Sequence, residues 1–234
     1  MSVRVRITDR FNGPPDSGNG GYTTGLIALA IGEPVGVRLA RPVPMNQDLV
    51  IASVGEGYWE ARAGSEVIAT AALQPVEVEV PQPPSWVEAL GVSQHFSGFT
   101  RHIYPTCFVC GPARGQGDGL RIFPGSVPGT QLFAAPWQPD ASLGDATGKV
   151  RPEFVWASLD CPGYFASANP KPALLGELAV RVDHVPRVGE PCVVTSWRIE
   201  GAGRKHKVGT ALFGADGQRC ALGVATWVEL KGGS

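Results

Sequence analysis

Four strand-like segments fill residues 177–230: ELAVRVDHV (177–185), PCVVTSWRIE (191–200), HKVGTALFG (206–214) and CALGVATWVEL (220–230). In each segment apolar residues alternate with polar ones or run together, and Val and Thr are frequent, as is typical of β-strands. Gly-containing segments that favour tight turns separate the later strands: EGAGR (200–204) and ADGQR (215–219). The last third of the chain therefore predicts an antiparallel meander.

A helix is predicted ahead of this meander, from about Pro152 to Ala168. Pro152 suits the first turn of a helix, whereas Pro162 should end or kink the helix just after Asp160. Two further strands are predicted upstream of the helix: LRIF (120–123) and TQLFAAPW (130–137). A helix followed by strands is thus the plan of the second half.

The first eighty residues repeat that plan. An apolar helix is predicted from about Gly21 to Ile31, after the strand SVRVRI (2–7) and a loop rich in Gly and Pro (12–20). Strands are predicted to follow it: VGVRLARPV (35–43), DLVIASVGEG (48–57), YWEARAGSEVIATAAL (58–73) and VEVEV (76–80). A plan that occurs twice in one chain predicts an internal duplication.

The duplication predicts an α+β fold made of two similar units. We expect the first unit in residues 1–80 and the second in residues 120–234, with a connector over residues 81–119 between them. A short helix around residues 86–90 and a Cys-x-x-Cys loop belong to the connector.

Composition narrows the possible partners. With 43% hydrophobic and 18% charged residues among 234, the chain can bury a good core. A formal net charge of -1 and the lack of a basic, aromatic platform argue against nucleic acid as a partner.

The longest apolar stretch, residues 26–31, is far shorter than the ~20 residues of a membrane span, and no signal peptide is recognisable. Five cysteines without a disulfide pattern favour reduced thiols. We therefore expect a cytoplasmic protein with no membrane partner.

The two predicted helices carry different functional groups. When they are aligned, Gly20 lies opposite Pro152 and Ala28 lies opposite Asp160. One half keeps glycines at a helix N-terminus, and the other half keeps an acid. A doubled fold can thus form one site from both copies, with backbone donors from the first and a carboxylate from the second.

These features resemble the hotdog superfamily, in which a long central helix is wrapped by a curved antiparallel sheet, and specifically the double-hotdog acyl-coenzyme A thioesterases. Four short motifs carry the resemblance: Asn19-Gly20-Gly21, Ala40-Arg41-Pro42, FVWASLD (154–160) and DGQRCALGVATWVEL (216–230). In single-hotdog thioesterases a His-Gly-Gly opening leads to a helical Asp or Glu, at the spacing that separates Gly20 from Ala28 here. Asn19 stands at the His position and Ala28 at the acid position of the first copy, so Asp160 alone retains the acid.

The resemblance implies a hydrolase of acyl thioesters, with acyl-coenzyme A as substrate and no cofactor. Backbone N–H groups at the start of a helix lack helical acceptors, and the helix dipole favours negative charge there. Gly20, Gly21 and Tyr22 would therefore stabilise an oxyanion. Asp160 would act as a general base on water or, as the second choice, as a nucleophile.

Related enzymes of the thioesterase II type pair this Asp with a Thr on the next strand and a Gln on the last strand. The Thr position falls near Gly176 and Glu177 of this sequence, and the Gln position falls near Ala225 and Thr226. Neither partner is kept. We expect Glu177 or Thr226 to orient the attacking water in their place.

Two basic clusters would suit a substrate that carries phosphates. The first lies at a predicted hairpin: Arg204-Lys205-His206-Lys207. The second consists of Arg114 and Arg121, which flank the segment GQGDG; this segment follows no strand, so a dinucleotide-binding fingerprint is not supported. We expect the first cluster, through Arg204, Lys205 and Lys207, to bind coenzyme A.

The pair Cys107-x-x-Cys110 raises the question of a metal site, with His95 and His102 as further ligands. A structural zinc site has four ligands. No second Cys pair follows, however, and the His spacings match no zinc finger. We therefore expect a tight Cys-Phe-Val-Cys-Gly turn that packs its thiols, and no metal.

Two other functions suit the same fold. A hotdog hydratase or dehydratase would need a His paired with an acid; His184 is the candidate, but the usual Asp-x-Asn-Pro-x-His arrangement is missing. A non-catalytic protein that binds acyl groups or other ligands is the second alternative, because fold does not fix activity. The duplication supplies the pairing that single hotdogs achieve by dimerising, so we expect a monomer or a homo-oligomer formed through sheet edges.

Overall fold

The computed structural model describes residues 2–231, and its strands join into one antiparallel sheet. The strands are β1 (Ser2–Arg6), β2 (Val35–Leu39), β3 (Asp48–Gly55), β4 (Tyr58–Ala63), β5 (Glu66–Leu73), β6 (Gly125–Ser126), β7 (Leu132–Trp137), β8 (Ala173–Val182), β9 (Cys192–Ala202), β10 (Lys205–Phe213) and β11 (Arg219–Glu229). Their order across the sheet is β1-β3-β4-β5-β2-β8-β11-β10-β9-β7-β6.

The two halves of the chain meet at the pairing of β2 with β8, where Val37 lies opposite Leu178. The four predicted C-terminal strands are confirmed as β8 to β11. Their connection is not a simple meander, because β8 pairs with β11 and not with β9. This arrangement leaves the other edge of β8 free to pair with the first half of the molecule.

The α-helices of residues 2–231 are α1 (Gly20–Ile31), α2 (Trp86–Ser93), α3 (Pro152–Ser158) and α4 (Cys161–Phe165). Asn19 caps α1, because its side chain accepts the Tyr22 N–H, and Gly32 ends the helix with a φ of 77°. The predicted helix of residues 152–168 is divided into α3 and α4, as expected for a proline at 162. None of these helices is long and apolar enough to cross a membrane.

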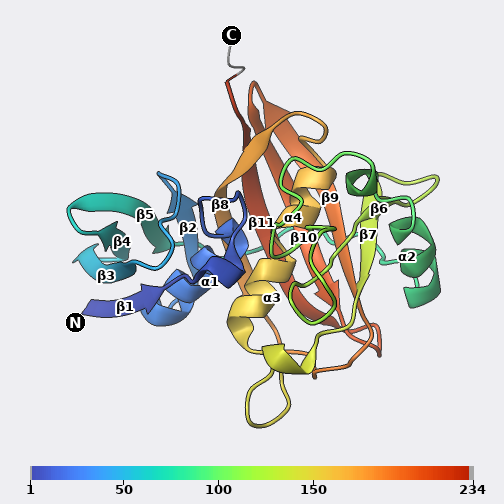
Figure 1. Ribbon diagram of the computed structural model, residues 1–234, viewed down its shortest axis with the longest axis horizontal. Coiled ribbons are helices and arrows are strands. Elements are labelled where there is room, and N and C mark those ends of the chain that lie inside the picture. The colour runs from blue at the N-terminus through green and yellow to red at the C-terminus, as the bar shows by residue number, and fades with distance from the viewer. Residues whose placement is uncertain (1, 232–234) are drawn as a thin grey trace.

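The central helices α1 and α3 pack side by side in front of the sheet (Figure 1). Glycines permit the close approach: a Cβ added to Gly25 would lie 2.7 Å from the Trp156 Cβ, and one added to Gly21 would lie 2.5 Å from the Asp160 Cβ. Because the start of α1 meets the end of α3, the two helices are antiparallel. The expected fold of two central helices, each wrapped by a curved antiparallel sheet, is therefore confirmed, and the two sheets are joined into one through β2 and β8.

Two predicted strands are wrong. VEVEV (76–80) belongs to no strand; its valines pack against an apolar cluster that includes Trp197 and Phe213, on the sheet face opposite the central helices. LRIF (120–123) is buried, but its N–H groups bind the carbonyl groups of the loop that carries Cys107, and Arg121 has a φ of 55°, which interrupts an extended strand. Apolar alternation alone does not reveal the hydrogen-bond partner of a segment.

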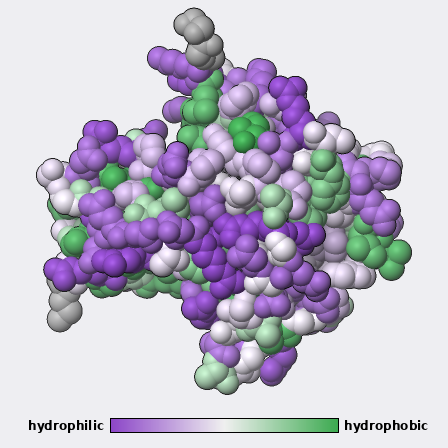
Figure 2. All heavy atoms as spheres, in the orientation of Figure 1, coloured by the Kyte–Doolittle hydropathy of each residue, from purple (hydrophilic) through white to green (hydrophobic). Residues whose placement is uncertain are grey.

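The connector crosses from one face of the sheet to the other. Helix α2 packs on β7 and β9 through Ala89, on the sheet face opposite the central helices, and Figure 2 shows a hydrophobic patch over this helix. The chain then returns to the helix side, where Phe96 packs on Phe165 of α4 with ring centroids 4.6 Å apart. This path brings the Cys-x-x-Cys loop to the junction of α1 and α4.

Candidate active site

Asp160 lies between α3 and α4 and faces the first turn of α1. Its side chain is buried, with 2% of the residue exposed. The Oδ2 atom accepts hydrogen bonds from the Gly21 N–H and from Asn19 Nδ2, both at 2.9 Å. Donors from the first half therefore hold the acid of the second half, as the alignment of the two helices predicts.

The Asp160 carboxyl group is poised to exchange a proton near neutral pH. Burial raises its pKa to about 7; the neighbouring Cys107 also raises it, whereas the hydrogen bonds from Gly21 and Asn19 oppose the shift. Among the described residues, its second oxygen, Oδ1, has no hydrogen-bond partner. Oδ1 is therefore the oxygen that keeps an unused capacity to accept a hydrogen bond.

A cavity of about 910 Å³ opens at this point, and Asn19, Gly20 and Asp160 form part of its wall. Apolar side chains form another part, among them Leu175, Phe165 and Trp227. An acid and a helix N-terminus thus face the same space as an apolar wall. The volume is within the range that proteins use for small-molecule ligands.

The three expected oxyanion donors differ in their availability. The Gly21 N–H is occupied by Asp160, and the Tyr22 N–H is occupied by the Asn19 side chain. The Gly20 residue lines the cavity, and its N–H donates to no protein acceptor within residues 2–231. Gly20 is therefore the free backbone donor of the set.

Glu177 and Thr226 do not reach the cavity. They face each other across β8 and β11, and Glu177 lines a separate depression with Arg38 and Gln74. Successive residues of a strand point to opposite faces, so the neighbouring Trp227 faces the cavity while Thr226 does not. The expected role of Glu177 and Thr226 in orienting water is thus corrected by their position.

Only part of the basic hairpin faces the cavity. Arg204 lines it and donates to the Glu229 carbonyl at 2.8 Å. Lys205 and Lys207 alternate with the buried His206 on β10, so they point away, and Lys207 lies 3.5 Å from Glu200 instead. Two further arginines line the cavity and were missed from sequence, because no basic run marks them: Arg41 and Arg101.

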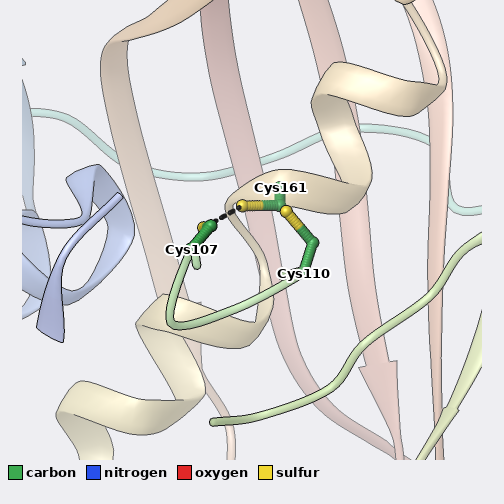
Figure 3. Close-up of side chains that lie close together, drawn as sticks. All are labelled: Cys107, Cys110 and Cys161. Carbon is green, nitrogen blue, oxygen red and sulfur yellow. Dashed lines mark hydrogen bonds between the residues drawn. The ribbon is translucent and has the colours of Figure 1, made fainter. Parts of the chain in front are cut away.

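The Cys-x-x-Cys loop contributes to the same wall together with a third cysteine. The sulfur atoms of Cys107, Cys110 and Cys161 all lie within 4.8 Å of one another, and Figure 3 shows them converging from the loop and from the start of α4. The pKa of the Cys107 thiol is held well below its usual range, chiefly by the Cys110 and Cys161 thiols. His95 is exposed and outside this group. Sequence spacing gave no sign of Cys161, which is far along the chain.

Together, two central helices, one continuous sheet and a site shared between both halves define the double-hotdog fold. No family model matches the sequence, and no curated protein matches it.

Solved structures with this fold are similar over the whole chain. A TesB protein of Mycobacterium avium subs paratuberculosis has a TM-score of 0.62 at 13% identity, with 98% of this chain and 93% of that chain covered. A protein of Novosphingobium aromaticivorans described as a thioesterase has a TM-score of 0.59 at 9% identity, with 99% and 96% covered. A protein of Lactobacillus plantarum described as an oleoyl thioesterase has a TM-score of 0.56 at 10% identity, with 99% and 97% covered.

Proposed function

We propose that this protein hydrolyses acyl thioesters, with acyl-coenzyme A as the substrate class and Asp160 as the general base. The observation that carries the proposal is the buried Asp160 carboxylate, which Asn19 and Gly21 hold at the wall of a cavity beside the free Gly20 N–H. A double-hotdog fold shared with proteins described as thioesterases supports the same reaction class.

The reaction requires a water molecule and two groups of the protein. Asp160 Oδ1 takes a proton from water as the water oxygen attacks the thioester carbonyl carbon. The Gly20 N–H at the start of α1 donates to the oxyanion that forms, and the helix dipole favours the same charge. The carbon–sulfur bond then breaks, and the leaving thiolate takes the proton back from Asp160. The products are a carboxylic acid and a free thiol.

The coenzyme A portion would lie at the mouth of the cavity. Arg41, Arg101 and Arg204 are exposed residues that also line it. Guanidinium groups form charge-assisted hydrogen bonds with phosphates. Lys205 and Lys207, which point elsewhere, would contribute only through their charge.

The hydratase alternative depends on His184, which is not part of the cavity wall. The His184 Nε2 atom lies 3.2 Å from the Cys220 sulfur instead. A non-catalytic ligand-binding protein remains the competing function, because no second acid from the predicted set lies beside Asp160.

The test is hydrolysis of a panel of acyl-coenzyme A substrates by the wild type and by Asp160→Asn, measured as thiol release. We expect Asp160→Asn to lower kcat by at least about 100-fold, the size of a lost general base. Glu177→Gln is the matched control, because it alters an acid of the same half outside the cavity, and its kcat should stay unchanged. Substrate binding without turnover in the wild type would show a binding protein instead.

A further inference from the structure

Cys107, Cys110 and Cys161 form a cluster that thioester hydrolysis does not use. All three are buried, with 4%, 4% and 6% of each residue exposed, and the Cys107 and Cys161 sulfur atoms are 3.6 Å apart. In a tetrahedral site with zinc–sulfur bonds of about 2.3 Å, neighbouring sulfur atoms lie about 3.8 Å apart. The Cys107–Cys161 pair therefore has nearly the spacing of two corners of such a site, and the Cys110 sulfur lies within 4.8 Å of both.

The backbone around the first two cysteines is fixed in this arrangement. The Gly111 N–H donates to the Cys107 carbonyl at 2.9 Å, and a Cβ at Gly111 would lie 2.5 Å from that oxygen, so only glycine fits. The same loop is tied down by hydrogen bonds from the N–H groups of Leu120 and Ile122. Two thiols of the cluster are thus held in place without a ligand.

A second observation points to a ligand at the cluster. The Asn19 Nδ2 atom lies 2.9 Å from Asp160 Oδ2 and 3.9 Å from the Cys107 sulfur, so the buried Asp160 carboxylate lies beside the thiols. Its Oδ1 atom is buried and, within the described chain, without a partner. A buried oxygen of this kind costs free energy unless a water or an ion satisfies it.

We propose that Cys107, Cys110 and Cys161 bind a zinc ion whose fourth coordination position opens onto the cavity. Soft thiolate ligands select zinc over hard cations. The three cysteines also line the cavity, so water can complete a tetrahedral site with three protein ligands, the arrangement in which zinc keeps an exchangeable position. Binding converts the thiols to thiolates and releases their protons.

The remaining cysteines provide the internal comparison. Cys192 and Cys220 are buried as well, but neither belongs to the cluster. Replacing either with serine changes a buried thiol by the same chemistry and leaves the three proposed ligands in place. An effect limited to Cys107, Cys110 and Cys161 therefore reports the site, not the loss of any thiol.

The first measurement is the metal content of the purified full chain, determined by elemental mass spectrometry. The second is the absorption spectrum of the reduced, metal-stripped chain after Co²⁺ is added. We expect about one zinc per chain and a thiolate-to-cobalt charge-transfer band, both lost in Cys107→Ser and Cys161→Ser and kept in Cys192→Ser and Cys220→Ser. Zinc added to the stripped wild type should raise Tm by preferential binding to the folded state, and the Cys161→Ser variant should show no such rise.

The proposal is overturned if the wild type contains no zinc and gives no cobalt spectrum. It is also overturned if the mass of the intact chain is lower by two hydrogens because Cys107 and Cys161 form a disulfide. If the serine variants fail to fold, the cobalt spectrum of the stripped wild type still decides. Metal content is measured without substrate, so this result is independent of the hydrolysis assay with Asp160→Asn.

Discussion

Asn19 donates to Asp160 across 141 residues of chain, with 2.9 Å between Nδ2 and Oδ2. The Oδ1 atom of Asn19 accepts a hydrogen bond from the Tyr22 N–H at 2.9 Å. One residue therefore both starts α1 and holds the acid of the other half. These two tasks can be separated by substitution, because serine also caps helices but lacks the amide donor.

We predict that Asn19→Ser and Asn19→Ala lower kcat by a similar factor, because both remove the donor to Asp160. Asn19→Ala should in addition lose about 1 kcal/mol of unfolding free energy, the typical contribution of an N-cap. Steady-state kinetics and urea unfolding of the two variants measure these effects. Equal kcat for the wild type and Asn19→Ser would show that the amide does not position Asp160.

Because the central helices pack closely, a single methyl group added between them should lower the free energy of unfolding. Gly25→Ala places its Cβ 2.7 Å from the Trp156 Cβ, so we expect a loss of about 1–3 kcal/mol in unfolding free energy. Gly91→Ala in α2 is the control: no atom lies within 4 Å of its added Cβ, and alanine should stabilise the helix by about 0.5–1 kcal/mol. Thermal unfolding of both variants should show shifts of opposite sign.

The position of Arg204 predicts an effect on substrate binding. Arg204→Ala should raise KM for acyl-coenzyme A roughly three- to tenfold, as expected for the loss of one hydrogen bond of about 0.6–1.4 kcal/mol, and should leave kcat unchanged. Lys205→Ala, one position along the chain but facing away, should change KM little. A substrate with a short thiol in place of coenzyme A should show equal KM for the wild type and both variants. A raised KM with that substrate would assign Arg204 a role in acyl binding.

Lowering the pH should reduce the stability that Glu229, a residue of the cavity wall, gives to the protein. Hydrogen bonds from His206 and Lys171 hold the pKa of Glu229 below its usual value, with Glu229 Oε1 2.8 Å from His206 Nε2. A carboxyl group with a depressed folded pKa stabilises the protein above its unfolded pKa of about 4.3, and this contribution disappears as pH falls through the folded value. The Tm of Glu229→Gln should thus be below that of the wild type at about pH 6, and the difference should shrink toward about pH 3. A difference that is constant over this range would contradict the ion pair.

The elements that sequence predicts correctly are those set by local chemistry. Pro152 at a helix start and the alternation in β8 to β11 are visible in the order of residues, and the contact of Asp160 with the first turn of α1 follows from aligning the two helices. The side chains that were misplaced depend on which face of a strand they occupy.

For Glu177 and Thr226, a shift of one position decides between the cavity and the other side of the sheet. A residue is inserted in this register, because Thr226 pairs with Glu177 whereas Trp227 pairs with Leu175. Such a bulge leaves no mark in composition. The convergence of Cys161 with Cys107 is equally invisible, since it arises from the path of the connector over α4.

Ala28 occupies, in the first copy, the place that Asp160 occupies in the second, and it is buried at 6% exposure. A methyl group cannot accept a proton from water. A dimer of identical single hotdogs would repeat its acid by symmetry, but this fused chain has one. Each molecule would therefore be saturated by a single equivalent of a tight-binding substrate analogue, and a titration should end at one bound ligand per chain.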